Sequence, residues 1–333
     1  MEKKIYDVYG IGNALVDMEF EVGEEFIRLM EIEKGLMTLV DEQRQQVLVD
    51  AVDGMRHRRT CGGSAANTII GISQFGGKTF YSCKVGNDET GDFYFGDLKE
   101  NGVATNLEFH ARETGTTGKC MVFITPDAER TMNTFLGITA NFSKLELAPE
   151  QLAKSQYLYI EGYLVTSPNG REAALEAKKL AAKHGVKTAM TFSDPSMPTY
   201  FREGLLEMIG DGVDVLFCNE NEAHIFTQTS STDEAFQALK KYAKSFVITQ
   251  GAQGALLYDG EKEIDIVTTP VKAIDTNGAG DLFSGAFLYG ITHGLSHHLS
   301  GKLACAAASK LVTQFGARLS HEQALEVKRQ IVS

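Results

Sequence analysis

The second half of the chain alternates short apolar runs with segments of helical spacing. The apolar runs are continuous, as in strands that are buried on both faces of a sheet. Strand followed by helix at this spacing predicts a mostly parallel sheet wound with helices. The expected strands are 157–160, 187–192, 213–218 and 246–249, and the expected helices are 171–184, about 231–244, 280–292 and 300–314. The third of these helices follows a glycine-rich segment, and the last two are expected to finish the chain.

The first half of the chain has a different pattern. After a good first strand at 5–11, four short or alternating apolar runs follow, and no long helix separates the first two. Alternation of this kind is typical of strands with one solvated face, and the last two runs resemble an antiparallel pair. We expect the four runs to form a small β-sheet that projects from the main domain as a lid, built from about 14–41 and 112–136. The runs are 15–21, 36–40, 119–125 and 131–135, and helices of the main domain are expected at 63–76 and 92–101.

Composition indicates one continuous folded unit. The 333 residues are 43% apolar and 23% charged, which are globular proportions. We find no repeat or linker, so a single domain over 1–333 is expected. The net charge of −12 argues against a nucleic-acid partner.

The chain shows no sign of a membrane or secreted protein. It has no membrane-length apolar run and no leader pattern in its first five residues. Its five cysteines never form a CxxC pair, which favours buried single thiols in a reducing compartment. We therefore expect a cytoplasmic protein.

The strongest chemical signal is the segment 275–281, which reads Asp-Thr-Asn-Gly-Ala-Gly-Asp. Apolar residues at helical spacing begin just after it, so Gly278, Ala279 and Gly280 open a buried helix. Small residues let backbone N–H groups approach a ligand closely, and a helix N-terminus favours an anion such as a phosphoryl group. Asp281 in the first turn would then accept a proton from an attacking hydroxyl. The alternative is an aspartate that only favours a helix start.

Two further segments carry polar groups at the starts of expected helices. Residues 61–67 read Cys-Gly-Gly-Ser-Ala-Ala-Asn, and the amide of Asn67 can donate to and accept from sugar hydroxyls. An ordinary glycine turn with Ser64 as a helix cap is the alternative. Residues 219–222 read Asn-Glu-Asn-Glu after a buried strand, where carboxylates and amides can hold hydrated Mg²⁺. A plain acidic helix start is the alternative there.

Together these segments resemble the ribokinase/PfkB family of small-molecule kinases. Residues 62–86 match its first signature, 275–281 its second, and Asn219-x-x-Glu222 its magnesium/phosphate motif. The motifs occur in the family's order, and the resemblance covers essentially the whole chain. It is greatest to the adenosine kinase branch, whose N-terminal substrate motif is similar to Gly-Asn-Ala-Leu-Val-Asp at 12–17.

The resemblance implies an α/β fold of the ribokinase type, with a mostly parallel central sheet flanked by helices and a small β-sheet lid. It also implies an ATP-dependent kinase that needs Mg²⁺, and in some members K⁺, and that phosphorylates the 5′-hydroxyl of a purine nucleoside, with adenosine as first choice. Family members occur as monomers and as dimers that pair through the lid, so a monomer and a homodimer both stay open.

The resemblance assigns roles residue by residue. Asp281 is the base, and the amides of Gly278, Ala279 and Gly280 and the lid side chain Arg130 stabilise the transferring phosphoryl group. Asp17 holds the ribose 2′- and 3′-hydroxyls, and Glu222 and Asn219 hold Mg²⁺ through water. The substrate set is Asn13, Leu15, Asp17, Met37, Gly63, Ser64, Asn67, Met132, Thr134 and Tyr163. The ATP set is Asn219, Thr249, Gly251, Asn277 and Ala308.

One segment departs from the adenosine kinase pattern. Where eukaryotic members show a small residue and then two aromatics, this chain has Glu161, Gly162, Tyr163 and Leu164. One ring survives and a carboxylate is added, so another ribonucleoside, or a sugar such as ribose, fructose or a keto-deoxy acid, stays open as acceptor. Ordinary lid packing is the alternative role for Met37 and Met132. A silent nucleoside-binding protein is disfavoured, because it would be expected to lose the base or the glycines.

Overall fold

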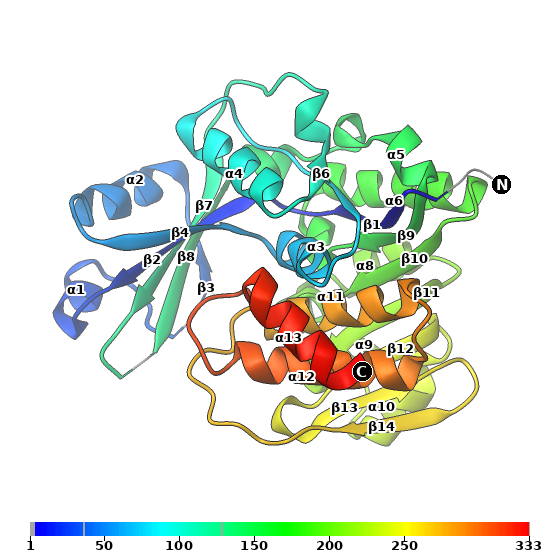
Figure 1. Ribbon diagram of the computed structural model, residues 1–333. Helices are drawn as coiled ribbons and strands as arrows, with labels where there is room; N and C mark the ends of the chain where they lie inside the picture. The colour runs from blue at the N-terminus through cyan, green and yellow to red at the C-terminus, as the bar shows by residue number, and fades with distance from the viewer. Residues whose placement is uncertain (1–3, 36, 128, 333) are drawn as a thin grey trace.

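The computed structural model describes residues 4–35, 37–127 and 129–332 (Figure 1). Within these residues the larger of two sheets has nine strands. They are β1 (Tyr6–Ile11), β5 (Thr79–Ser82), β6 (Ala104–Thr105), β9 (Ser155–Ile160), β10 (Lys187–Thr191), β11 (Val213–Asn219), β12 (Ala243–Thr249), β13 (Gly254–Tyr258) and β14 (Glu263–Val267). Their order is β14-β13-β12-β11-β10-β9-β1-β5-β6. Neighbours from β12 to β6 are parallel, and β13 pairs antiparallel with both β12 and β14.

Helices cover both faces of this sheet. Successive strand residues point to opposite faces, so Val8 packs in one core and Tyr9 in the other. The helices over the Val8 face are α3 (Ser64–Gln74), α4 (Glu89–Glu100), α11 (Ala279–Thr292), α12 (His297–Leu311) and α13 (His321–Val332). Those over the Tyr9 face are α5 (Pro149–Ala153), α6 (Pro168–Lys183), α7 (Ser196–Tyr200), α8 (Arg202–Ile209), α9 (Glu220–Thr227) and α10 (Thr232–Leu239).

The second, smaller sheet projects from the main body, on the left of Figure 1. Its strands are β2 (Leu15–Glu21), β3 (Met37–Leu39), β4 (His57–Gly62), β7 (Thr117–Ile124) and β8 (Arg130–Gly137), in the order β3-β8-β7-β2-β4. Helices α1 (Glu24–Leu29) and α2 (Glu42–Ala51) cover one face, where Phe20, Met121 and Phe123 are buried. The alternate residues Cys120 and Val122 face the opposite way and line a cavity against the main body.

The expected fold class is confirmed, because a large, mostly parallel sheet flanked by helices carries a second, smaller sheet. The strand at 15–21 and the antiparallel pair of β7 and β8 agree with the expectation. Residues 1–3, on which the absence of a leader partly rested, and Leu36, the first residue of the expected strand 36–40, lie outside the described residues.

Several elements differ from the expectation. The small sheet contains β4, whose sequence begins His-Arg-Arg-Thr, because an edge strand with both faces partly solvated can be polar. The chain ends with a third helix, α13, after the two that were expected. The helix expected to run to about residue 244 ends at Leu239, since Ala243 already pairs in β12. Its capping box is half formed: Ser231 accepts from the N–H of Glu234, but the Glu234 carboxylate accepts from Ser230 instead.

Two expectations from composition are also answered by the described residues. All five cysteines are buried and unbridged there. None of the described helices combines the length and the apolar character that crossing a membrane requires.

Glu161 anchors the point where the chain first leaves the main body for the small sheet. It follows β9, is 0% exposed, and accepts from the backbone N–H of Asn13 at 3.1 Å and from the Asn13 amide at 2.9 Å. Its second oxygen accepts from the N–H of Ala65, in the first turn of α3, at 2.8 Å. Burial raises the pKa of Glu161 to about 7, although these hydrogen bonds oppose the rise.

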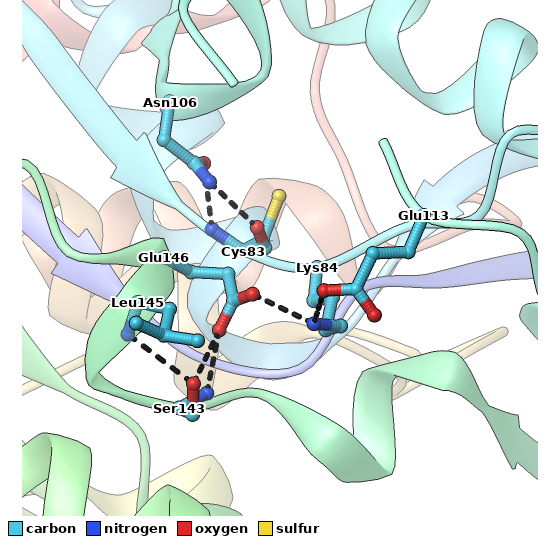
Figure 2. A network of polar contacts seen from close by, with 7 residues as sticks. All are labelled: Cys83, Lys84, Asn106, Glu113, Ser143, Leu145 and Glu146. Carbon is cyan, nitrogen blue, oxygen red and sulfur yellow. Dashed lines mark hydrogen bonds and ion pairs between the residues drawn. The ribbon is translucent and has the colours of Figure 1, made fainter. Parts of the chain in front are cut away.

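Lys84 ties together two later connections between the sheets (Figure 2). Its ammonium lies 2.7 Å from Glu113, which precedes β7, and 2.7 Å from Glu146, which follows the return from β8. The other oxygen of Glu146 accepts from the N–H and hydroxyl of Ser143. Because Lys84 and Glu146 are both buried, neither charge can be left without its partner at low cost.

Glu161→Gln should change how stability depends on pH. A carboxyl pKa of about 7 in the folded chain, against 4.5 as its ordinary value, means that the folded state binds more protons between these values. The stability that Glu161 contributes is therefore complete below pH 4.5 and lost as the pH rises through 7. Urea unfolding at several pH values should show that this slope is shallower in the variant. An identical slope in both proteins would contradict the assignment.

Lys84→Met should lower the free energy of unfolding by about 3 kcal/mol, because it strands the buried carboxylate of Glu146. The matched control is Lys144→Met, since the Lys144–Glu172 pair is exposed at 56% and 60% of its side chains. That variant should lose much less stability, because solvent screens an exposed ion pair. Urea unfolding measures both, and equal losses would show that Lys84 contributes no more than a surface pair.

Candidate active site

A cavity of about 460 Å³ lies between the small sheet and the carboxyl ends of the parallel strands, where ligands bind in open α/β sheets. Most of the residues singled out in the sequence line it together. They are Asn13, Leu15, Asp17, Met37, Gly63, Ser64, Asn67, Met132, Thr134, Tyr163, Asn219, Glu222, Thr249, Asn277, Gly278, Ala279, Gly280 and Asp281. Segments more than 250 residues apart in the chain thus meet in one place.

The remaining three predicted residues lie in two adjoining hollows. Gly251 and Ala308 line a hollow of about 240 Å³. Thr249, Ala279 and Gly280 line both this hollow and the cavity. Arg130 lines the other, beside Asn277. The start of α11 therefore borders both the cavity and the Gly251–Ala308 hollow, which suits a group that must pass from one to the other.

The start of α11 has the features of an anion site. Gly278 has φ of 72°, and a Cβ there would lie 2.7 Å from Ala317, so only glycine fits. No side chain of the described residues caps the helix, and none of their atoms lies within 4 Å of a Cβ placed on Gly280. The N–H of Ala279 donates to the carbonyl of Thr276, whereas open space at Gly280 and the positive end of a 14-residue helix coincide there.

Asp281 lies beside this helix start with its carboxylate held on both oxygens. The Ser64 hydroxyl donates to one oxygen at 2.6 Å and the Asn67 amide donates to the other at 3.0 Å. Burial raises the pKa of Asp281 above its ordinary value, and these two hydrogen bonds oppose the rise. A carboxylate with a raised pKa and remaining lone pairs can accept a proton from a hydroxyl group in the cavity.

Arg318 is the main group of this site that the sequence analysis missed. It lies in the loop between α12 and α13, with its side chain 12% exposed. Its guanidinium donates to Asn67 Oδ1 at 3.2 Å, to Asp97 at 2.9 Å and to the carbonyl of Cys61. A single arginine in a loop without a motif gives no sequence signal, so only the tertiary structure reveals these contacts.

Asp17 faces the cavity from β2. Burial raises its pKa to about 7, while the charges of Arg318 and Arg130 oppose the rise. Gly62 lies against its carboxylate, since a Cβ there would meet Asp17 Oδ1 at 2.1 Å, and a Cβ on Gly63, at φ of 97°, would meet the carbonyl oxygen of Asn13 at 2.3 Å. This close approach of two backbone segments brings Asp17, Asn13 and Asn67 to the same wall of the cavity.

Asn219 and Glu222 form a complete capping box at the start of α9. Asn219 Oδ1 accepts from the N–H of Glu222, and the Glu222 carboxylate accepts from the N–H and the amide of Asn219. Glu222 is 4% exposed, and burial raises its pKa to about 7. Among the described residues, no group of three or more His, Cys, Asp or Glu side chains is arranged to hold a metal. A Mg²⁺ ion at this edge would therefore have to keep several waters.

Arg130 does reach the glycine-rich segment, but a carboxylate holds it there. Its guanidinium lies 2.7 Å from Asp275, and Glu19 is 3.4 Å away. Asp275 also accepts from the N–H groups of Asn277 and Gly316, so it ties three segments together. The ion pair thus places Arg130 beside residues 275–277 of the glycine-rich segment.

The small sheet and the segment after β9 form the apolar end of the cavity. Met37, Met132 and Thr134 lie on its strands, and Tyr163 faces them from the 3₁₀ turn Gly162–Thr166. Glu161, the added carboxylate, also borders the cavity, but both of its oxygens already accept backbone or amide donors. Its observed contacts are therefore structural.

Comparisons with known proteins agree with this geometry. The model of the family described as "pfkB family carbohydrate kinase" matches residues 35–324 of this chain. Adenosine kinase 1 of Arabidopsis thaliana is 28% identical over 92% of this chain and 94% of its own. The crystal structure of adenosine kinase from Sinorhizobium meliloti has 33% identity and a TM-score of 0.87, covering 98% of this chain and 99% of that one. A probable sugar kinase from Rhizobium etli has 32% identity and a TM-score of 0.88, covering 98% of both chains.

These matches confirm the expected family and its closeness to adenosine kinases, while a relative described as a sugar kinase is equally similar. The family profile spans most of the chain and includes the segments that build the cavity, from Gly63 to Asp281. The chain therefore belongs to the pfkB family of carbohydrate kinases, phosphotransferases that act on a hydroxyl group.

Proposed function

We propose that this kinase transfers a phosphoryl group from ATP to the 5′-hydroxyl of a ribonucleoside, with adenosine as its first-choice acceptor, so that it returns adenosine to the AMP pool. The observation that carries the proposal is the position of Asp281. Its carboxylate lies beside the uncapped start of α11 and in the same cavity as Asp17 and the apolar end formed by the small sheet. The proposed base, the proposed anion site, the polar contact for the ribose and the apolar contacts for the nucleobase therefore line one cavity.

In this mechanism the acceptor is fixed before it reacts. Asp17 accepts hydrogen bonds from the ribose hydroxyls, and Asn13 adds a further polar contact, so that the 5′-hydroxyl points at Asp281. Met37, Met132 and Tyr163 enclose the base, which removes water from the reacting groups.

Asp281 accepts the hydroxyl proton as the new bond to phosphorus forms. The amides of Gly278, Ala279 and Gly280, together with Arg130, stabilise the charge that spreads over the transferring group. The nucleotide moiety of ATP lies in the hollow bordered by Thr249, Gly251 and Ala308. Mg²⁺, bound through water near Asn219 and Glu222, would neutralise phosphate charge.

A sugar kinase of the same family is the second candidate. It is favoured by the relative described as a probable sugar kinase, and by the segment 161–164, in which Tyr163 is the one aromatic residue. A sugar acceptor would use Asp17, Asn13 and Asp281 in the same way, and it would leave the apolar end unfilled.

The first experiment measures ADP release with ATP and Mg²⁺, with and without K⁺. The acceptor panel contains adenosine, inosine, guanosine, cytidine, ribose, fructose and 2-keto-3-deoxygluconate, and Asp281→Asn is the blank. Turnover should be highest with adenosine, and the variant should lose it by a factor on the order of 10² to 10⁴ while it still binds the acceptor, because only the proton acceptor is removed. Turnover on a sugar alone would overturn the acceptor assignment, and a fully active variant would remove Asp281 from the role of base.

Asp17→Ala should act mainly on nucleoside binding. The variant removes the carboxylate assigned to the ribose hydroxyls, so the Kd for adenosine should rise by at least about tenfold. Isothermal titration calorimetry measures it, with the Kd for ATP as the internal control that should not change. An unchanged adenosine Kd would contradict the ribose assignment.

A further inference from the structure

Arg318 connects the candidate base to a buried network behind the cavity. Its Nε–H donates to Asn67 Oδ1 at 3.2 Å, and the Asn67 amide nitrogen donates in turn to Asp281 at 3.0 Å. Arg318 itself is held by Asp97 at 2.9 Å. The chain of contacts therefore runs from a carboxylate on α4, through a guanidinium and an amide, to the carboxylate on α11.

The orientation of the Asn67 amide follows from its two partners. Arg318 offers only donors, so the amide oxygen must face it. The amide NH₂ group then faces Asp281, which offers only acceptors when ionised. The flipped amide would place two donors together on one side and two acceptors together on the other. Asn67 is also 6% exposed, so water cannot easily replace either partner.

The loop that carries Arg318 supports the site at a second point. The N–H of Gly316 donates to Asp275, and Ala317 packs against Gly278 in the glycine-rich segment. Three consecutive residues thus contact the anion site and, through Asn67, the base. A loop without a recognisable motif sets the relative position of both.

Asp97 fixes the guanidinium from the opposite side. Its carboxylate accepts from Arg318 and from the N–H of Cys61, and the Cys61 carbonyl accepts from Arg318 in turn. Cys61 leads directly into the turn that starts α3. The same contacts therefore hold the backbone that carries Ser64 and Asn67.

We propose that Arg318 is a positioning residue for phosphoryl transfer, which acts through Asn67 to hold the Asp281 carboxylate in the orientation that receives the acceptor's proton. The proposal deepens the proposed function and rests on it for the identity of the base. It does not depend on which acceptor is used, because none of the contacts involves the apolar end of the cavity.

The positive charge of Arg318 also favours the ionised form of Asp281, in addition to the contacts made through Asn67. The titratable or charged groups around Asp281 are Asp17, Tyr159, Glu161, Tyr163, Asp194, Glu222 and Arg318. Only the last of these named groups is a cation. It lowers the pKa of Asp281 against the effect of burial, so it favours the ionised form of the base.

Two substitutions separate geometry from charge. Arg318→Met removes both, whereas Arg318→Lys keeps the charge but cannot donate to Asn67 and Asp97 from one planar fork. Arg202→Met is the matched control, because Arg202 is also partly buried, with 24% of its side chain exposed, and bonds to a backbone carbonyl on the Tyr9 face of the main sheet. Thermal unfolding of all three identifies any general loss of folding.

The first readout needs no turnover. Carbon-13 labelling of aspartate side chains reports the titration of the Asp281 carboxyl carbon by NMR, with Asp281→Asn to assign the signal. The Asp281 pKa should rise in Arg318→Met and stay at the wild-type value in Arg318→Lys and Arg202→Met. An unchanged pKa in Arg318→Met would overturn the proposed charge effect even if the acceptor panel found no substrate.

The second readout uses the acceptor that the panel selects. In Arg318→Met, kcat should fall by about 100-fold, as expected for a displaced catalytic group, with little change in the KM for ATP. The acidic limb of its pH profile should move to higher pH, because a base with a raised pKa loses its proton only at higher pH. Arg318→Lys should lower kcat without moving this limb.

The outcomes distinguish this proposal from the proposed function. Wild-type kcat in both Arg318 variants, alongside an inactive Asp281→Asn, would overturn the positioning role and leave the base assignment intact. An active Asp281→Asn would instead overturn the base assignment itself. A similar loss of kcat in Arg202→Met would show that the effect is a general one on the fold.

Discussion

Five carboxyl groups face one small cavity, and much of the local structure serves to keep them there. Carboxylates that share a low-dielectric site repel one another and lose hydration, so each needs donors or a cation close by. The side-chain amide of Asn219 donates to Glu222, and the backbone N–H of Ser196 donates to Asp194. Glu161 accepts from three N–H donors. These donors come from helix starts and strand ends, which is why the cavity forms where so many of these meet.

The groups assigned to chemistry are compensated differently from the structural ones. Both oxygens of Glu161 accept hydrogen bonds from protein donors. This suits a residue that anchors the connection from β1 to β2 against the start of α3. Asp281 has one donor on each oxygen and further lone pairs in the cavity. Asp17 relies mainly on the charges of nearby arginines. The protein thus places three donors on Glu161 but only two on Asp281.

The sequence predicted the local parts of this arrangement well. Glycine patterns and helix starts are local signals, so the start of α11 after the glycines of 275–281 and the turn before Asn67 could be inferred from the sequence, as could the fold class. The capping box of Asn219 and Glu222 is also local, and it corresponds to the alternative of a helix start that the sequence left open.

Contacts that depend on tertiary structure could not be predicted in this way. Arg318 meets Asn67 across 251 positions of the chain, and its loop has no motif. Strand β4 begins with polar residues because it is an edge, which hides the alternation that would reveal it. Glu161 was noticed as an extra charge near the base pocket, but its role as an anchor required the positions of Asn13 and Ala65.

The pair of Arg130 and Asp275 has a mechanical consequence. The backbone of Arg130 belongs to the small sheet, whereas Asp275 is bonded to the glycine-rich segment and to the loop before α13. A rotation of the small sheet away from the main body must therefore either break this ion pair or pull on the glycine-rich segment. Movement of the small sheet and movement of the glycine-rich segment are thereby coupled through the Arg130–Asp275 ion pair.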